Sequence, residues 1–584
     1  MSRIGHFGTR GAALAALTLL AGCGADTPAP APAAVDAPQP VLAADAGGYY
    51  GTREPFSAEA VYFLITDRFV NGDPGNDHRE QGGARGSFDI PTPGGPPDRH
   101  DNIGYLGGDF KGILDHADYI REMGFGAIWL TPIVDNPDEA FAGGEPATWD
   151  AMLRDGGKSG YHGYWGVNFY QLDEHWPSPG LGFRELTAGL KDKGLKTVLD
   201  VVANHGSPSF GMVEDQPKFG EIYDREGRLV ADHQNLPPEQ LDPAKQPLHA
   251  FFHQERDLVQ LSNLDEDNPA VLDYLAGAYL MWIEQGVDAV RIDTLGHMPL
   301  SFWKRFTDRL RAGRPGLFIM GERFSYEAAE LAKHTWPENG AISVLDFPLK
   351  QALSAVMSQP GSDYREVEAA LHLENGPYTN PYELLTFYDN HDMPRLAASD
   401  QGFINAHNFL FTARGIPVIY YGSEMGFMRG TGEHAGNRNY FGVEGIAAAR
   451  QHPIRAQLIR IAELRRQSPV LQRGLQLNLL FEGDRAAFLR VLEDGEQSAQ
   501  ALVLLNKGDE PAHFQFDNFV DAGRWVDALS ALPVEVGADG YFAARLAPHD
   551  VAVYQLTQAP KDPELRARLD QAMQQRLGPV EPKS

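Results

Sequence analysis

The run GVDAVRID, residues 286–293, ends in two charged side chains, Arg291 and Asp293. Residues two apart on a β-strand lie on the same face, so the guanidinium can keep the carboxylate ionised. An ion pair at a solvent-exposed strand edge is the simplest interpretation of this spacing. The alternative is a catalytic carboxylate at the mouth of a parallel barrel, because active sites of such barrels lie at the carboxyl ends of the strands.

Three further β-rich runs end in side chains that can do acid–base chemistry. LDVVANH ends in Asn204 and His205, MGE ends in Glu322, and FYDNHD ends in His391 and Asp392. One such acid is usually an exposed loop residue, but acids or histidines at four strand ends are expected to share one pocket. Converging carboxylates repel one another, so a cation must hold some ionised while another stays protonated. With an aromatic content of 10%, this pairing points to glycoside hydrolysis.

The elements that would position these residues alternate between short β-rich runs and amphipathic helical stretches. The alternation predicts an α/β fold built on a parallel (β/α)₈ TIM barrel. The eight predicted strands lie within residues 61–69, 125–133, 195–205, 287–293, 316–322, 341–347, 383–389 and 415–421.

Two segments depart from this alternation. Residues 206–263 are irregular and rich in Pro, Gly and Asp, which is too long for an ordinary βα loop and predicts an excursion domain after the third strand. After residue 468 the pattern changes to short alternating runs, which predict an antiparallel β-sandwich. The predicted division is 56–205 and 264–468 for the two parts of the barrel, 206–263 for the excursion domain, 469–558 for the β-sandwich and 559–584 for a C-terminal helix and tail.

The composition is that of a globular chain with an acidic surface. Of 584 residues, 43% are hydrophobic, and the formal net charge is −29. Such a balance argues against nucleic acid and anionic substrates and suits a neutral ligand. We expect a monomer.

The N-terminus has the pattern of an export signal. A basic start and the apolar run GAALAALTLLAG, which is too short for a good membrane span, precede the only cysteine, Cys23. We expect residues 1–22 to be a lipoprotein signal peptide, Cys23 to be acylated, and residues 23–55 to be a Pro/Ala-rich tether. An ordinary signal peptide followed by a free thiol is the alternative. The expected product is exported and lipid-anchored to a bacterial membrane, on its periplasmic or cell-surface side, with no other membrane contact.

Four segments carry a family resemblance. In order and spacing, LDVVANH, GVDAVRIDTLGH, MGE and FYDNHD resemble the signature regions of the α-amylase family of glycoside hydrolases, family 13. The resemblance extends from about Val61 to Leu556. Through TDRFVNGDPGND, YLGGDFKGI, YHGYW and ARGIPVIYYGSE it is most detailed toward the cyclomaltodextrin glucanotransferase, maltogenic amylase and cyclomaltodextrinase branch.

The resemblance implies a retaining hydrolase of α-1,4-glucosidic bonds in starch, maltodextrins or cyclodextrins. It assigns Asp293 as the nucleophile, Glu322 as the acid and base, and Asp392 as the clamp on the sugar hydroxyls. A transglycosylase and a non-catalytic glucan-binding surface lipoprotein are the alternatives. The implied substrate contacts are Arg291, His205, His391, Arg438, Tyr164 as a stacking ring, and Trp165, for which core packing is an equal alternative.

Calcium is also implied by the resemblance, at one site and optionally at a second. A simple Asx-type turn is the alternative for the segment NGDPGND. In the second site, Asn263 stands where relatives usually have Asp. The first implied site comprises Asn71, Asp73, Asn76, Asp77, the carbonyl of Gly107 and Asp109, and the second comprises Asn204, Asn263 and the carbonyl of His297.

Several positions depart from the family pattern. Gly296 stands where many α-1,4-glucan enzymes carry a lysine that contacts the acceptor-side sugar, so that contact is expected to be lost. Val259 stands where cyclising transferases place an aromatic ring. Arg438 matches half of a donor-side Asp/Arg pair, with His434 or Glu433 in the place of the acid. With the lack of room for further C-terminal domains, the first two departures favour hydrolysis over cyclisation.

Overall fold

The computed structural model describes residues 47–95, 101–359, 361–432, 434, 436–495 and 497–577. The predicted signal peptide, Cys23 and most of the predicted tether lie outside these residues. In the part of the chain that is described, every helix is too short or too polar to cross a membrane.

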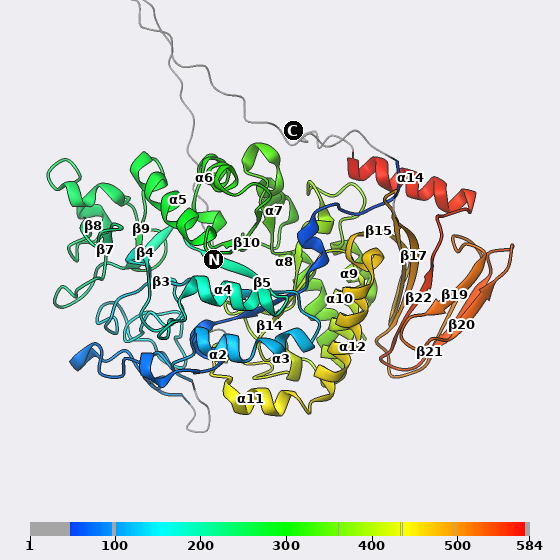
Figure 1. Cartoon of the computed structure of the whole chain (residues 1–584), viewed down its shortest axis with the longest axis horizontal. Helices are drawn as coiled ribbons and strands as arrows, with labels where there is room; N and C mark the ends of the chain where they lie inside the picture. Colours follow the sequence, from blue (N-terminus) through cyan, green and yellow to red (C-terminus); the bar gives the residue numbers. More distant parts are fainter. Residues whose placement is uncertain are drawn as a thin grey trace, which may run out of the picture. The chain divides into compact units, whose positions relative to one another are not determined.

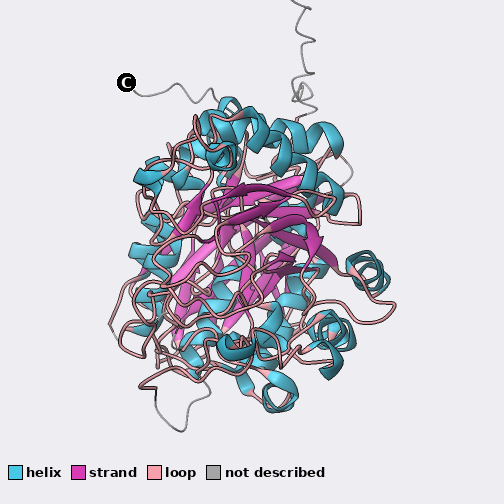
Figure 2. Ribbon diagram, turned by 90° about the vertical axis from the view of Figure 1, so that its left-hand side faces the viewer, coloured by secondary structure: helices cyan, strands magenta, loops and turns pink. Residues whose placement is uncertain are grey.

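A parallel barrel of eight strands forms the centre of the fold, as the sequence predicted (Figure 2). The strands follow the order β12-β11-β10-β5-β2-β1-β14-β13, and a parallel bridge between Leu345 and Leu385 closes the ring. Each strand comes from one of the eight predicted runs. Their bounds are β1 (Val61–Leu64), β2 (Ala127–Leu130), β5 (Lys196–Val201), β10 (Ala289–Ile292), β11 (Phe318–Gly321), β12 (Ser343–Val344), β13 (Leu385–Thr386) and β14 (Ile416–Tyr420).

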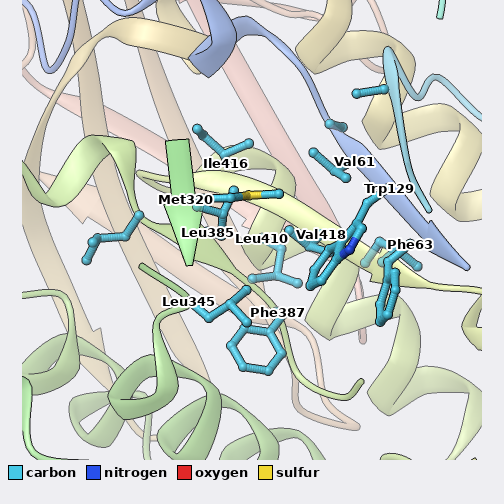
Figure 3. Packing of buried hydrophobic residues seen from close by; sticks show 14 of the residues in the cluster. Val61, Phe63, Trp129, Met320, Leu345, Leu385, Phe387, Leu410, Ile416 and Val418 are labelled. Carbon is cyan, nitrogen blue, oxygen red and sulfur yellow. The ribbon is translucent and has the colours of Figure 1, made fainter. Parts of the chain in front are cut away.

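The barrel interior is filled by large apolar side chains, so it is a packed core and not a pore (Figure 3). Phe63 of β1 stacks on Trp129 of β2 with ring centroids 3.9 Å apart. Met320 of β11 and Val418 of β14 are also buried. Because parallel strands are covered on both faces, these runs are rich in apolar residues, and the charged residues at the carboxyl ends of β10 and β11 stand out.

Helices surround the barrel (Figure 1). Some of them begin with a side-chain cap: α5, for example, begins with Pro269 after Asn268, whose side chain accepts from the backbone N–H of Ala270. The helices of the barrel are α1 (Thr66–Phe69), α2 (Phe110–Asp115), α3 (Ala117–Glu122), α4 (Phe183–Asp192), α5 (Pro269–Ile283), α6 (Leu300–Gly313), α7 (Ala328–Thr335), α8 (Phe347–Ser358), α9 (Tyr364–Ala370), α10 (Asp400–Thr412), α11 (Gly442–Ala449) and α12 (Pro453–Gln467).

Short strands and 3₁₀ helices occupy many of the loops. In the segment predicted as the excursion domain, β6 (His205–Pro208) pairs with β9 (Leu261–Asn263), and β7 (Glu221–Tyr223) pairs with β8 (Leu229–Asp232). The loop after β2 contains β3 (Val134–Asp135) and β4 (Asn168–Leu172). The 3₁₀ helices are η1 (Pro55–Ala58), η2 (Pro74–Asn76), η3 (Gly83–Arg85), η4 (Pro238–Gln240), η5 (Pro247–Phe251), η6 (Leu295–His297), η7 (Pro337–Asn339), η8 (Pro381–Glu383) and η9 (Ser423–Met425).

Antiparallel strands follow the barrel, which confirms the predicted all-β region. A six-stranded sheet has the order β15-β16-β17-β22-β19-β20, and β18 pairs with β21. The ring of Phe542 on β21 packs edge-on against Tyr554 on β22, with centroids 5.1 Å apart. The bounds are α13 (Pro469–Arg473), β15 (Leu475–Glu482), β16 (Arg485–Glu493), β17 (Ser498–Asn506), β18 (Ala512–Phe516), β19 (Gly523–Asp527), β20 (Pro533–Val536), β21 (Phe542–Leu546), β22 (Val551–Leu556) and α14 (Pro563–Leu577).

Candidate active site

Two carboxylates emerge from neighbouring strands at the mouth of the barrel. Asp293 follows β10 directly, and its backbone N–H donates to the carbonyl of Val201 over 2.9 Å. Glu322 follows β11 directly, and its N–H donates to the carbonyl of Ile292 over 2.8 Å. Both residues are only 5% exposed. The register of the sheet therefore sets the two carboxyl groups side by side at one rim.

Arg291 links these carboxyl groups through one guanidinium. Its Nη1 lies 2.8 Å from Oδ1 of Asp293 and 2.9 Å from Oδ1 of Asp200, and its Nη2 lies 2.5 Å from Oε2 of Glu322. Arg291 is completely buried, so the interpretation as a surface ion pair is wrong. Burial alone would lower the pKa of Arg291, but the three carboxylates raise it well above its ordinary value. The guanidinium is thus a permanent cation inside an acidic pocket.

The surroundings of Glu322 favour its protonated form. Burial, reinforced by the charges of Asp392, Asp293 and Asp200, raises the pKa of Glu322 to about 8, although Arg291 opposes the shift. A carboxyl group with such a pKa carries a proton at neutral pH and can donate it. This is the property that a general acid needs.

The surroundings of Asp392 favour the opposite state. Its Oδ2 lies 3.0 Å from Nε2 of His391, and its Oδ1 lies 2.5 Å from Nη2 of Arg438. Burial would raise the pKa of Asp392, but His391, His434 and Arg438 outweigh it and hold the pKa well below the usual range. Glu322 and Asp392 are therefore separated into an acid and a fixed anion by their neighbours.

Tyr164 closes another side of the pocket. Its hydroxyl donates to Oδ2 of Asp200 over 2.8 Å, and its ring stacks on His391 with centroids 5.4 Å apart and an interplanar angle of 11°. The indole N–H of Trp129 donates to the same oxygen of Asp200 over 3.0 Å. Burial raises the pKa of Asp200 to about 7. Asp200 holds both Arg291 and Tyr164 in place, a positioning role that the sequence analysis did not assign to it.

Two other predicted contacts differ in their surroundings. Trp165 lies in a small apolar cluster with Phe141, Met212 and Phe219, which fits the core-packing alternative better than a sugar contact. His205 is buried, and its Nδ1 has no hydrogen-bond partner among the described residues. Burial lowers the pKa of His205, so a neutral ring is available to a ligand.

Arg438 and His434 both contact Asp392. Nη2 of Arg438 contacts Nε2 of His434 over 2.7 Å as well as Asp392. Burial, together with the charge of Arg438, lowers the pKa of His434 to about 3, so this histidine is neutral. Glu433, the other candidate for the place of the missing acid, lies outside the described residues.

The first implied calcium site gathers oxygen atoms that lack donors. Among the described residues, Oδ1 of Asn71 and Oδ1 of Asn76 are buried without a hydrogen-bond partner. Asp109 is buried nearby and accepts the N–H groups of Gly72 and Asp73 over 3.1 and 2.7 Å. A Cβ at Gly107 would collide with Asn71 and Asp77, so only glycine lets the backbone approach here. Amide and carboxylate oxygens are the ligands that Ca²⁺ prefers, and the two unsatisfied amide oxygens with the neighbouring carboxylates fit it.

The second implied site contains a carboxylate that the sequence analysis missed. Oδ2 of Asp257 accepts from Nδ2 of Asn204 over 3.0 Å, and Oδ1 of Asp257 lies 2.9 Å from Nδ1 of His297. Oδ1 of Asn204 is buried with no partner in the described chain. Asn263 lies opposite His205 in the β6–β9 pair. Asp257 thus brings to this place the acid that position 263 lacks.

Three other clusters of acidic and histidine side chains occur in the described part of the chain, and none includes the implied calcium ligands. They comprise Asp173, Glu174 and His175; Asp135, Asp138 and Glu174; and His253, Asp265 and Glu266. In the second of these, the ammonium of Lys218 already contacts Asp135 and Asp138, over 3.2 and 2.8 Å.

The fold is that of a (β/α)₈ enzyme, and the mouth of its barrel carries two neighbouring carboxyl groups. The sequence model of the α-amylase catalytic domain matches residues 63–445, and the chain belongs to the α-amylase family. Members of this family are glycoside hydrolases and transglycosylases. The family resemblance and the fold predicted from the sequence are both confirmed.

Individual relatives include both kinds of enzyme. The cyclomaltodextrin glucanotransferase of Klebsiella oxytoca is 27% identical over 503 residues, which cover 78% of this chain and 71% of that protein. The α-amylase of Geobacillus thermoleovorans, solved in complex with acarbose, is 26% identical with a TM-score of 0.66 over 86% of this chain and 99% of that one. A solved cyclomaltodextrin glucanotransferase, described as the first with a three-domain ABC distribution, is 28% identical with a TM-score of 0.71 over 86% and 99%. A lack of further C-terminal domains therefore does not separate hydrolysis from cyclisation.

Proposed function

We propose that the protein is a retaining hydrolase of α-1,4-glucosidic bonds in starch, maltodextrins or cyclodextrins. The observation that carries this proposal is the pair of carboxyl groups bridged by Arg291. Asp293 is held against Nη1 of the guanidinium, and Glu322, with a pKa of about 8, is held against Nη2. A carboxylate and a protonated carboxyl group at one cation are the two parts that retaining chemistry requires.

In the first step, the carboxyl group of Glu322 gives its proton to the glycosidic oxygen as the bond from that oxygen to C1 breaks. An oxygen of Asp293 forms the new bond to C1, which yields a glycosyl ester and a released sugar. In the second step, the Glu322 carboxylate takes a proton from water while the water oxygen attacks C1 and displaces Asp293. Two inversions at C1 retain its configuration, and retaining pairs are usually separated by about 5–5.5 Å.

The remaining groups bind and orient the reacting sugar. Asp392 is ionised and partly exposed, so it can accept hydrogen bonds from two neighbouring sugar hydroxyls. These bonds favour a flattened ring and the positive charge that develops on it. Tyr164 offers a ring face backed by His391, and neutral His205 offers a ring nitrogen.

Calcium and export belong to the same proposal. The first set of oxygen ligands would hold a structural Ca²⁺ between the loops after β1 and before α2, and the second set, now including Asp257, would tie the segment 206–263 to the barrel. When bound, such an ion supplies rigidity and no step of the reaction. We also propose an exported monomer that is anchored to a bacterial membrane through acylated Cys23.

Transglycosylation is the second candidate function, because cyclomaltodextrin glucanotransferases are among the relatives. In that reaction a sugar hydroxyl replaces water in the second step. At the position where cyclising enzymes are expected to have a ring, Val259 is half-exposed and has a positive φ of 46°. The products of maltoheptaose at high concentration discriminate the two, since longer or cyclic products indicate transfer and short linear ones indicate hydrolysis. No observation favours a non-catalytic glucan-binding lipoprotein.

The test measures reducing ends released from soluble starch, maltoheptaose and β-cyclodextrin by the wild type and by Asp293→Asn. Asp308→Asn is the matched control, because Asp308 is an exposed acid that pairs with Lys304 on α6. We expect activity in the wild type and in the control and a loss of at least about 10³-fold in Asp293→Asn. A wild type inactive on every α-glucan, or an unaffected Asp293→Asn variant, refutes the proposal.

A further inference from the structure

The side chain of Arg323 fills the space beside Gly296. A Cβ built on Gly296 would collide with Nη1 of Arg323 and lie 2.8 Å from its Cζ. Arg323 directly follows Glu322, and Gly296 lies three residues after Asp293. The guanidinium of Arg323 therefore crosses from the loop after β11 to lie against the turn after β10, which begins at Asp293.

The Arg323 side chain has no hydrogen bond or ion pair in the described part of the chain, although it is only partly exposed. A guanidinium carries five N–H donors in a planar fork. Other arginines at the rim, such as Arg291 and Arg438, donate hydrogen bonds to carboxylates. Donors that are held at a catalytic rim without a partner are available to the hydroxyl groups of a neutral ligand.

An aromatic pair lies on the same loop. Phe324 and Tyr326 are 52% and 38% exposed, and their ring centroids lie 6.1 Å apart. Both rings pack against buried Phe347, at 5.0 and 5.9 Å. Large exposed rings supported from below, next to a free guanidinium, suit a pyranose sugar, which has apolar faces and hydroxyl edges.

The position of this loop decides which sugar it would bind. The clamp of Asp392 and Arg438 comes from the segments after β13 and β14, whereas Arg323 and Gly296 follow β11 and β10. Glu322 directly precedes Arg323 in the loop after β11, and in the proposed reaction its proton goes to the oxygen of the sugar that leaves. A glucan that runs across the mouth from the clamp past Glu322 therefore places its leaving-side sugar at the loop 323–326.

We propose that Arg323 is a specificity-determining residue that binds the sugar on the leaving-group side, from the space that Gly296 leaves open, with Phe324 and Tyr326 as its apolar support. This inference rests on the proposed function. Because the same place receives the incoming sugar in a transfer reaction, Arg323 would also raise the share of transfer relative to hydrolysis. The cation is thus retained at the site but is delivered by the neighbouring strand.

The test measures kcat/KM of the wild type, Arg323→Ala and Arg323→Met on two substrates. Maltoheptaose carries sugars on the leaving side, whereas nitrophenyl α-maltotrioside, cleaved at the aryl bond, carries none. We expect both variants to lose about 10-fold in kcat/KM on maltoheptaose, mostly in KM, and less than about 2-fold on the aryl substrate. Arg314→Ala is the matched control, since this exposed arginine ends α6 at the opposite face of the barrel.

The variant Arg323→Ala/Gly296→Lys tests the exchange of positions directly. A lysine at 296 points into the vacated space, so it should restore at least half of the lost kcat/KM on maltoheptaose. Equal losses on both substrates, no loss on either, or no restoration by Gly296→Lys would overturn the inference. A wild type without activity on any α-glucan would instead refute the proposed function, so the two failures are distinguishable.

Discussion

Replacing Arg291 by methionine tests the central cation of the pocket. Methionine keeps much of the volume but removes the charge that contacts Asp293, Asp200 and Glu322. Loss of one partner from a buried charge network typically costs about 3–5 kcal/mol, because the remaining charges are left uncompensated. We expect that loss in the free energy of unfolding near neutral pH, and a fall of at least about 10³-fold in kcat/KM through the misplaced acid and nucleophile.

The stability of Arg291→Met relative to the wild type should change with pH in one direction. In the wild type, Arg291 opposes the raised pKa of Glu322 and of Asp200, so its removal raises both further. A group whose folded pKa lies above its unfolded value binds more protons in the folded state, and stability is lost as the pH rises. The variant should therefore be least stable above neutral pH and approach the wild type toward pH ~5.

The assay measures the thermal unfolding temperature and kcat/KM on nitrophenyl α-maltotrioside between pH ~5 and ~9, a range that spans the raised pKa values of the carboxyl groups. Arg291→Lys keeps one charge but cannot reach Nη1 and Nη2 contacts together, so it should fall between wild type and Arg291→Met. Arg314→Met is the control on an exposed arginine. If Arg291→Met unfolds at the wild-type temperature at every pH and keeps its rate within about 5-fold, the reasoning is refuted.

Three further predictions follow from individual contacts. The pKa of Glu322 is about 8 in the folded protein and 4.5 in the unfolded chain, so the wild type loses stability as the pH rises from 4.5 to 8. Glutamine does not ionise, so Glu322→Gln should unfold at a higher temperature than the wild type at pH 8, and the two should differ little near pH ~4. The same temperature difference at both pH values would contradict this. Tyr164→Phe removes only the bond to Asp200 and should lose about 10-fold or less in kcat/KM, whereas Tyr164→Ala should lose clearly more; equal losses would exclude a role for the ring. Chelation of Ca²⁺ should lower the unfolding temperature of the wild type more than that of Asn71→Ala, and equal shifts would place the ion elsewhere.

The parts predictable from the sequence are those that local pattern determines. Strands such as β11 are apolar on both faces, so the end of the run and the acid that follows it are visible as a break. Arg291 and Asp293 are two residues apart, and this spacing alone places them on one face. The barrel and its antiparallel C-terminal region therefore follow from short runs and spacings, whereas the roles of Asp293 and Glu322 come from the family resemblance.

The parts that could not be predicted depend on contacts between distant segments. Asp257 meets Asn204 and His297 only because the chain folds back over the barrel, and nothing in its neighbourhood distinguishes it from other loop acids. Arg323 appears in the sequence as an ordinary residue after a strand, and its position over Gly296 depends on the register between β10 and β11. Trp165 is similar: its spacing within YHGYW does not reveal that Phe141 and Phe219 enclose it.

The most direct test of the account is to trap the covalent intermediate. An activated maltosyl fluoride, incubated with Glu322→Gln to slow the second step, should add the mass of one maltosyl unit to the protein, and peptide mapping should locate the ester on Asp293. The same incubation with Asp293→Asn should give no adduct. An adduct on another residue, or turnover with no adduct and with inverted configuration in the first sugar released, would contradict the account.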